Sequence, residues 1–208
     1  WIAQLFYDYW LFTGDREFLQ NHALPFLKET ALFYEDFLVE GPDGKYLFMP
    51  SMSPENTPDV PGASIIVINA TMDIALAKEV LGNLCTACRV LGVEEEGIAR
   101  WEAMLAKMPA YEINEEGAFR EWLYPGLKES YRHRHVSHIY PLFPGFEISR
   151  EDHPDFFKAI WVAVKKRLVI GLCDQTGWSL AHLANIYARL ESGEEALECL
   201  ELLCRVCV

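Results

Sequence analysis

The chain has 208 residues, of which 51% are hydrophobic, enough to bury a sizeable core. It carries 31 acidic and 18 basic residues and a formal net charge of −13, so a nucleic-acid backbone or an anionic membrane surface would repel it. No apolar run in the sequence approaches the roughly 20 residues that span a bilayer. Composition therefore favours a globular protein with neither a nucleic-acid nor a membrane partner.

Apolar residues recur at helical spacing near the start of the chain. The pattern predicts helices over residues 1–12 and 24–39, with Asp15 as a cap for the segment between them. The second helix presents one apolar stripe, made of Leu24, Leu27, Ala31, Tyr34 and Leu38. Gly41-Pro-Asp-Gly44 then signals a turn, and residues 45–68, with four prolines and no stripe, form a long loop.

Helical periodicity returns later in the chain and predicts an all-α fold. The expected helices cover residues 71–91, 95–107, 154–169, 178–190 and 194–208. Residues 109–149 are irregular, with 119–123 either strand or turn. Long unequal loops between helices, without a fixed repeat length, favour a toroid of paired helices over a regular solenoid. Because both ends fall inside apolar periodic patterns, we interpret the chain as a fragment truncated at both ends.

Six cysteines include two CxxC pairs, Cys85 with Cys88 and Cys204 with Cys207. Both pairs lie inside predicted helices, and neither is followed by the glycine-containing knuckle that closes two thiolates on zinc. We therefore expect buried free thiols. Free thiols mildly favour a reducing, cytoplasmic location, although localisation stays open between cytoplasmic and secreted.

Three polar segments occupy the loops between helices: Pro50–Thr57, His133–His138 and Asp174–Ser179. Loops on a rigid scaffold usually carry the chemistry of a protein, and these three point to an enzyme that acts on a sugar. Glycosidases commonly use a pair of acidic residues, and Glu55 and Asp174 are the acidic residues of these segments.

The order and spacing of several motifs resemble glycoside hydrolase family 95, the inverting α-L-fucosidases. The matching stretches are Phe12-Thr-Gly-Asp-Arg-Glu-Phe-Leu19, Ser53-Pro-Glu-Asn56, Thr71-Met-Asp73, Glu121-Trp122, His133-Arg-His-Val-Ser-His138, Phe143-Pro-Gly145, Gly177-Trp-Ser-Leu180 and Tyr187-Ala-Arg-Leu190. The resemblance implies that residues 1–208 form part of a single (α/α)6-barrel catalytic domain. It also implies a fucosylated oligosaccharide substrate with terminal α-L-fucose, often 1,2-linked to galactose, and no metal or other cofactor.

The resemblance assigns the general acid to Glu55, in the matching Ser-Pro-Glu-Asn motif. Met49, Pro50 and Met52 predict an apolar setting that raises the pKa of its carboxyl and keeps it protonated. A carboxylate that caps a helix or forms a surface ion pair is the alternative. Asn56 could orient Glu55 or a sugar hydroxyl through its amide, or could serve only to form the turn.

Asp174 is the implied general base, because family members carry an acidic residue before Gly-Trp-Ser. Many members read Arg-Gly-Asp-Gly-Gly-Thr-Gly-Trp-Ser, whereas this chain reads Gly171-Leu-Cys-Asp-Gln-Thr-Gly-Trp-Ser179, with the acid one residue nearer the tryptophan. A helix cap is the alternative role for Asp174. The family's upstream asparagine pair, which helps to prepare the attacking water, is absent from the chain. We therefore expect hydrolysis to require the remainder of the parent polypeptide.

Arg134 and His135 match the family's sugar-contacting Arg-His pair, in which a guanidinium and an imidazole each hold a hydroxyl. The three histidines of this segment also suggest a metal site, but the sequence shows no carboxylate partner for them. Ser137 and His138 are expected to brace the loop through bonds to the backbone.

Asp8 aligns with a position where many members carry Glu, and could reach a fucose hydroxyl or be exposed to solvent. Trp122 and Trp178 could stack on a sugar or pack in the core.

Two other functions fit the same sequence. The toroid could act on α-L-galactose or another deoxyhexose, or it could be a non-catalytic helical-repeat module whose loops bind a protein. A cavity shared by Glu55 and Asp174, with Arg134 and His135 on its wall, would argue against the binding module.

Overall fold

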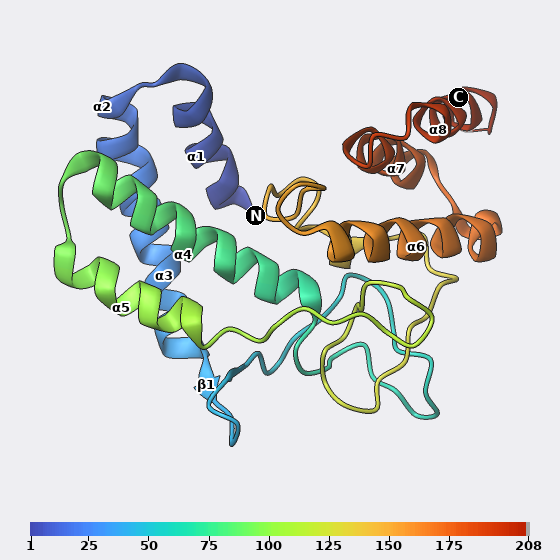
Figure 1. Ribbon diagram of the computed structural model, residues 1–208, viewed down its shortest axis with the longest axis horizontal. Coiled ribbons are helices and arrows are strands. Elements are labelled where there is room, and N and C mark those ends of the chain that lie inside the picture. Colours follow the sequence, from blue (N-terminus) through green and yellow to red (C-terminus); the bar gives the residue numbers. More distant parts are fainter. Residues whose placement is uncertain (207–208) are drawn as a thin grey trace. The chain divides into compact units, whose positions relative to one another are not determined.

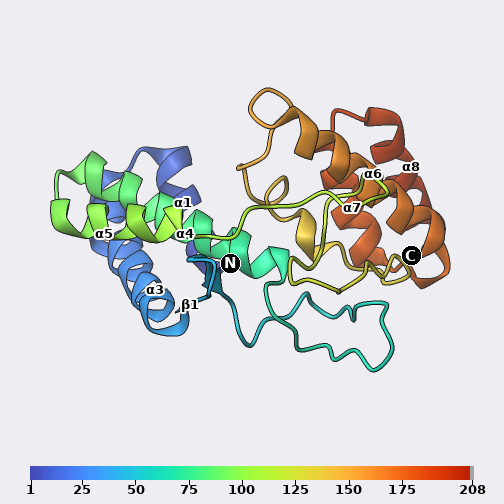
Figure 2. The same cartoon turned by 60° about the horizontal axis from the view of Figure 1, so that its bottom comes forward.

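The computed structural model describes residues 1–206, so Cys207 and Val208, the end of the last predicted helix, lie outside the described residues. The chain divides into two compact units, Trp1–Met49 with Asp73–Ala110 and Pro50–Met72 with Tyr111–Val208. Figures 1 and 2 show the elements of both units. Helices dominate the described part and its only sheet has two short strands, which confirms the all-α prediction. Within that part, no helix has the length and apolar character needed to cross a membrane.

The first unit is built from helices that pack on apolar stripes. Its elements are α1 (Ile2–Thr13), α2 (Arg16–Phe18), a π-helical turn (Leu19–Ala23), α3 (Leu24–Phe37), most of α4 (Thr71–Leu91) and α5 (Glu95–Ala106). The predicted stripe of α3 is confirmed, since Leu24, Leu27 and Ala31 are buried and Tyr34 is half-buried. Across from it, Trp101 of α5 is buried and its Nε1 donates to Glu35 of α3 at 2.8 Å.

The helix ends of this unit follow the local signals in the sequence. Asp15 caps α2, because its Oδ1 accepts the backbone N–H of Phe18 at 2.9 Å. Gly92 ends α4 with a positive φ of 73°, a conformation that glycine adopts without steric cost. The predicted turn at Gly41–Gly44 joins two short strands, β1 (Val39–Glu40) and β2 (Tyr46–Leu47), paired antiparallel with Val39 opposite Leu47.

The second unit combines three helices with two long irregular segments, residues 50–70 and 111–153. The helices are α6 (Pro154–Ile170), α7 (Gly177–Arg189) and α8 (Gly193–Val206), and α7 packs along α8. Figures 1 and 2 show the two irregular segments as long loops. Residues 119–123 form bridges and not a strand: Phe119 pairs with Ile113, and Trp122 with Ala70. Trp122 and Phe119 are fully buried and form the core beneath these loops.

The cysteines of the described residues are free thiols, as predicted. Cys85 and Cys88 are buried in α4, which agrees with the expected environment. Cys204 is exposed on α8, so the expectation of burial is wrong for that position. Its expected partner, Cys207, lies outside the described residues.

Candidate active site

Two of the predicted site loops are joined directly in the second unit. The loop that carries Glu55 is closed by a bridge between Ser51 and Val67. Ser137, at the start of a 3-10 turn (Ser137–Ile139), donates its Oγ hydrogen to the carbonyl oxygen of Pro54 at 2.7 Å. The expected bracing role of Ser137 is therefore confirmed, and the bond places the histidine segment beside Glu55.

Glu55 lies in a polar and exposed setting. Its carboxylate accepts a bond from Arg134 Nη2 at 2.7 Å, and His135 Nε2 lies 3.7 Å from the same oxygen. The side chain of Glu55 is 61% exposed, so the predicted apolar environment is wrong. Glu55 forms an ion pair, which was the alternative to the apolar setting. The partner in this ion pair is Arg134, the residue predicted to hold the sugar.

Glu55 and Asp174 line one cavity of about 460 Å³, which is large enough for a small ligand. Its lining residues include Glu55, Thr57, Arg132, Arg134, Asp174 and Thr176. Of the predicted wall residues, Arg134 lines the cavity, and His135 lies beside it through the contact with Glu55. One cavity with two carboxylates and a guanidinium can hold a polyhydroxylated ligand between an acid and a base.

Asp174 does not cap the following helix. It closes a 3-10 turn (Leu172–Asp174), and its side chain is exposed. The cap of α7 is Thr176, whose Oγ1 faces the N–H of Ser179 while the Ser179 Oγ accepts the N–H of Thr176 at 2.7 Å. Because Thr176 satisfies the helix end, Asp174 has no capping role, and it lines the cavity as an exposed residue.

His133 and His135 lie beside Glu55 in surroundings that favour the neutral imidazole. Burial lowers the pKa of both rings, and the guanidinium of Arg134 lowers it further. The rings stack, with their centroids 5.0 Å apart. A neutral imidazole offers one donor and one acceptor, the pair of functions that a sugar hydroxyl can use.

The histidines have a carboxylate neighbour after all, which corrects the sequence-based expectation. The ligand atoms of Glu55, His133 and His135 lie within 4.8 Å of one another. The surroundings nevertheless disfavour a metal ion. Arg134 already pairs with Glu55, and His133 Nδ1 accepts the backbone N–H of His135 at 3.1 Å, so the proton of the neutral His133 ring is on Nε2.

Asn56 braces its loop. Its Nδ2 donates to Glu121 at 2.9 Å and to the carbonyl of Ser130 at 3.0 Å, while its Oδ1 accepts the N–H of Thr57. Both amide hydrogens are therefore used within the protein, and the side chain is buried. The structure favours the alternative in which Asn56 shapes the turn over a direct bond to a sugar hydroxyl.

The two remaining predicted contacts lie elsewhere. Trp178 stands in the first turn of α7 and is 69% exposed, so it is not a core residue, and its stacking on a sugar stays a prediction. Trp122 is buried, so of its two expected roles the structure bears out packing in the core. Asp8 belongs to α1 in the first unit, where burial raises the pKa of its carboxyl, and its contact with substrate also stays a prediction.

Sequence reasoning left Glu121 without a role, yet it is the buried centre of this unit. The side chains of Glu121 and Arg167 are both fully buried, and Arg167 Nη2 donates to Glu121 at 2.6 Å. Burial favours the neutral acid, but Arg167, His138 and the hydrogen bond from Ser53 together outweigh burial and lower the pKa of Glu121. The Nδ1 atom of His138 lies 3.8 Å from Glu121, and burial lowers the pKa of His138 to about 4. Neither ring nitrogen of His138 has a hydrogen-bond partner among the described residues, so the bonds to the backbone expected for this residue are wrong.

A signal for this pair was present in the sequence. Arg167 occupies a position of the α6 stripe that Phe157, Ile160 and Val164 otherwise fill with apolar side chains. An arginine at helical spacing in a buried stripe requires a buried acceptor, because an unpaired buried charge is costly. The sequence did not show which acidic residue would supply it.

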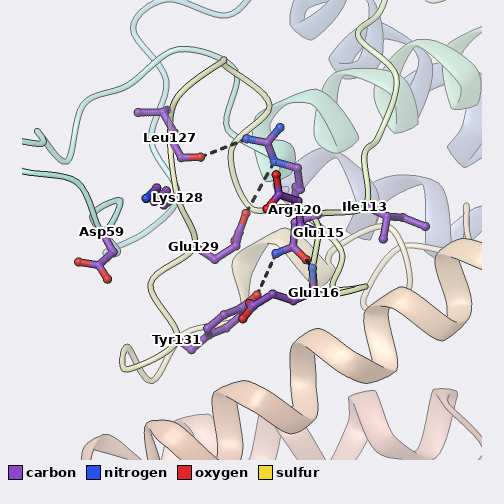
Figure 3. Close-up of a pocket in the computed structure, with 10 residues that line it drawn as sticks. Asp59, Ile113, Glu115, Glu116, Arg120, Leu127, Lys128, Glu129 and Tyr131 are labelled. Carbon is purple, nitrogen blue, oxygen red and sulfur yellow. Dashed lines mark hydrogen bonds and ion pairs between the residues drawn. The ribbon is translucent and has the colours of Figure 1, made fainter.

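Residues 128–132 contribute to the lining of two cavities, the cavity of Glu55 and a second cavity of about 660 Å³. Figure 3 shows the residues that line the second cavity. Lys128, Glu129 and Tyr131 face this cavity, while Ser130 and Arg132 line the cavity of Glu55. Both carboxylate oxygens of Glu129 lie 3.1 Å from the backbone nitrogen of Glu121. Burial, reinforced by the charge of Glu121, raises the pKa of Glu129 to about 8, so this carboxyl is mostly protonated at neutral pH.

Comparison with known proteins identifies the family of this chain. Residues 1–207 match the model of the glycosyl hydrolase family 95 catalytic domain. The chain is also similar to "Alpha-L-fucosidase 2" of Arabidopsis thaliana, with 35% identity over 199 residues, which is 94% of this chain and 23% of that protein. The chain thus spans about a quarter of the length of this curated relative. Because the family model matches almost every residue, the chain belongs to the glycosyl hydrolase family 95 catalytic-domain family.

Proposed function

We propose that the protein containing this chain is an α-L-fucosidase that removes terminal α-L-fucose, 1,2-linked to galactose, with inversion of configuration. The chain would contribute part of a single (α/α)6-barrel catalytic domain. The observation that carries the proposal is that Glu55, Asp174 and Arg134 line one cavity. Similarity to a protein named as an α-L-fucosidase supports the choice of sugar.

In this mechanism Glu55 protonates the glycosidic oxygen and Asp174 takes a proton from the attacking water. Asp174 is exposed in the cavity and has no role as a helix cap, so its carboxylate is available to a water molecule. Arg134 pairs with Glu55 in the absence of sugar. A sugar hydroxyl that accepts the N–H groups of Arg134 would release Glu55 to hold the proton that it donates.

The neutral imidazole of His135 suits a second hydroxyl of the same sugar, because it can donate or accept. Its position 3.7 Å from Glu55 would place that hydroxyl next to the glycosidic bond. Trp178 completes the proposed sugar contacts by stacking on the apolar face of the ring.

The test is hydrolysis of 2′-fucosyllactose by the full-length protein, with the released sugar followed by proton NMR before mutarotation. Initial release of β-L-fucose is the expected result. Initial α-L-fucose would show retention and overturn the assignment of Asp174 as a base. If the protein released no sugar from 2′-fucosyllactose but hydrolysed an α-L-galactoside, the substrate would be α-L-galactose and not α-L-fucose.

The role of Glu55 is tested with Glu55→Gln in the same full-length protein. Loss of a general acid should lower kcat by at least about 10²-fold with little change in substrate affinity. Asp59→Asn is a matched control, because Asp59 is an exposed carboxylate four residues further along the same loop and lines the second cavity. If both variants keep near-normal turnover, Glu55 is not the acid.

A further inference from the structure

The two residues that flank Pro54 and Glu55 are both bonded to one buried carboxylate. Ser53 Oγ donates to Glu121 Oε1 at 2.6 Å, and Asn56 Nδ2 donates to Glu121 Oε2 at 2.9 Å. Ser53 and Glu121 have no exposed surface, and Asn56 has only 3%. Glu121 therefore holds the loop at both sides of the candidate acid without access to the cavity itself.

Arg167, the ion-pair partner of Glu121, holds the residues on either side of Arg134. Arg167 Nη1 donates to the backbone carbonyls of His133 at 3.0 Å and His135 at 2.5 Å. Its Nη2 donates to Glu121 at 2.6 Å. One guanidinium thus fixes the backbone immediately before and after Arg134, while the same guanidinium is bonded to the carboxylate that fixes the loop of Glu55.

We propose that the buried Glu121–Arg167 ion pair is a positioning pair that holds the proton donor Glu55 against the sugar-binding Arg134. Neither member of the pair reaches solvent, so neither is a catalytic residue. The pair fixes the residues that flank Glu55 and Arg134, whose side chains lie 2.7 Å apart in the absence of sugar. This inference rests on the proposed function, since it assigns the pair to the reaction of that same site.

A buried ion pair suits this task better than apolar packing. Such a pair contributes little net stability compared with well-packed apolar side chains, but its bonds are directional and permit one arrangement of the groups that they join. Catalysis depends strongly on such an arrangement, because a displacement of about 1 Å can cost roughly 10²-fold in rate. The pair also explains why an arginine interrupts the apolar stripe of α6.

Direct removal of either charge risks unfolding, because it leaves the other charge buried and unpaired. The sharper probe is Ser53→Ala, which removes one hydroxyl bonded to Glu121 and leaves the ion pair in place. Ser53→Thr restores a hydroxyl at that position. The matched control is Ser51→Ala, because Ser51 is another buried serine of the same loop, and its Oγ accepts the N–H of Ala70 at 2.9 Å.

The measurement is kcat and KM of the full-length protein and the three variants on 2′-fucosyllactose and on α-L-fucosyl fluoride. We expect Ser53→Ala to lower kcat on the oligosaccharide by about 10-fold or more with little change in KM. The loss on the fluoride should be clearly smaller, because fluoride leaves with little help from a proton donor. Ser53→Thr should recover most of the activity, and Ser51→Ala should stay within about threefold of the wild type.

A purely structural role would give a different pattern. The inference is overturned if Ser53→Ala stays within about threefold of the wild type, or if Ser53→Ala and Ser51→Ala lose activity alike. An equal loss on both substrates would also overturn it, because a misplaced acid must affect the poorer leaving group more. If the wild type releases fucose from neither substrate, the proposed function itself fails, which is a distinct result and removes the basis of this inference.

Discussion

Replacing Glu129 by Gln should stabilise the protein at alkaline pH. Glu129 is buried, with a side chain 6% exposed, and burial together with the charge of Glu121 raises its pKa from 4.5 to about 8. Arg120 Nε lies 4.0 Å away and Arg167 already pairs with Glu121, so neither arginine reverses this rise. The folded protein therefore keeps a proton on Glu129 at pH values where the unfolded chain releases it.

The sign and size of the effect follow from proton linkage. Between about pH 4.5 and pH 8 the folded state binds more protons at this site, so the free energy of unfolding falls as pH rises. At about 1.4 kcal/mol for each pKa unit, the rise in pKa corresponds to a loss of at most about 5 kcal/mol above pH 8. Gln has the size of the protonated acid and cannot ionise, so Glu129→Gln removes this loss.

Thermal unfolding of the full-length protein at pH 5 and pH 9 tests the reasoning. Because other groups titrate over the same range, the informative quantity is Tm of Glu129→Gln minus Tm of the wild type at each pH. We expect this difference to become more positive by several degrees from pH 5 to pH 9. Glu115→Gln, an exposed carboxyl on the same cavity, is the control and should show no such change. A difference that is constant, or that falls with pH, would show that Glu129 is ionised in the folded protein.

Two further predictions concern the segment around Asp174. Thr176→Ala removes the cap of α7 and should lower the free energy of unfolding by about 1 kcal/mol, with a fall in kcat, whereas Thr176→Ser should retain both in unfolding and kinetic measurements. Gly171→Ala would place a Cβ 2.6 Å from the carbonyl oxygen of Arg132 and 2.8 Å from that of Arg167, so we expect a lower Tm and loss of the proposed activity. Gly82→Ala, in α4 with nothing within 4 Å of the new Cβ, should leave Tm unchanged or raise it; an equal loss in both glycine variants would contradict this explanation.

Most of the helices could be predicted from the sequence because their signals are local. Apolar residues three and four positions apart share one helical face, and this spacing alone predicted α3 and its buried stripe. Caps depend on neighbours within a turn, so Asp15 before α2 and Gly92 after α4 could also be identified. The chemical candidates came from the residue types in the loops and from the family resemblance, which the family match confirms.

The tertiary structure alone brought those candidates together. Glu55 and Arg134 are 79 residues apart in the chain, and their contact at 2.7 Å replaced the apolar setting that the neighbours of Glu55 had suggested. Glu121 and Arg167 are separated by 46 residues, and the sequence shows each charge but not its partner. The cap of α7 was a local signal that the sequence analysis missed, because Thr176 stands directly before the helix; only the structure shows that Asp174 lines the cavity with Glu55. The sequence by itself determined the helices and the kinds of side chain in the loops, because both depend on near neighbours; the charge state and orientation of those side chains depend on burial and on distant partners, which only the folded chain supplies.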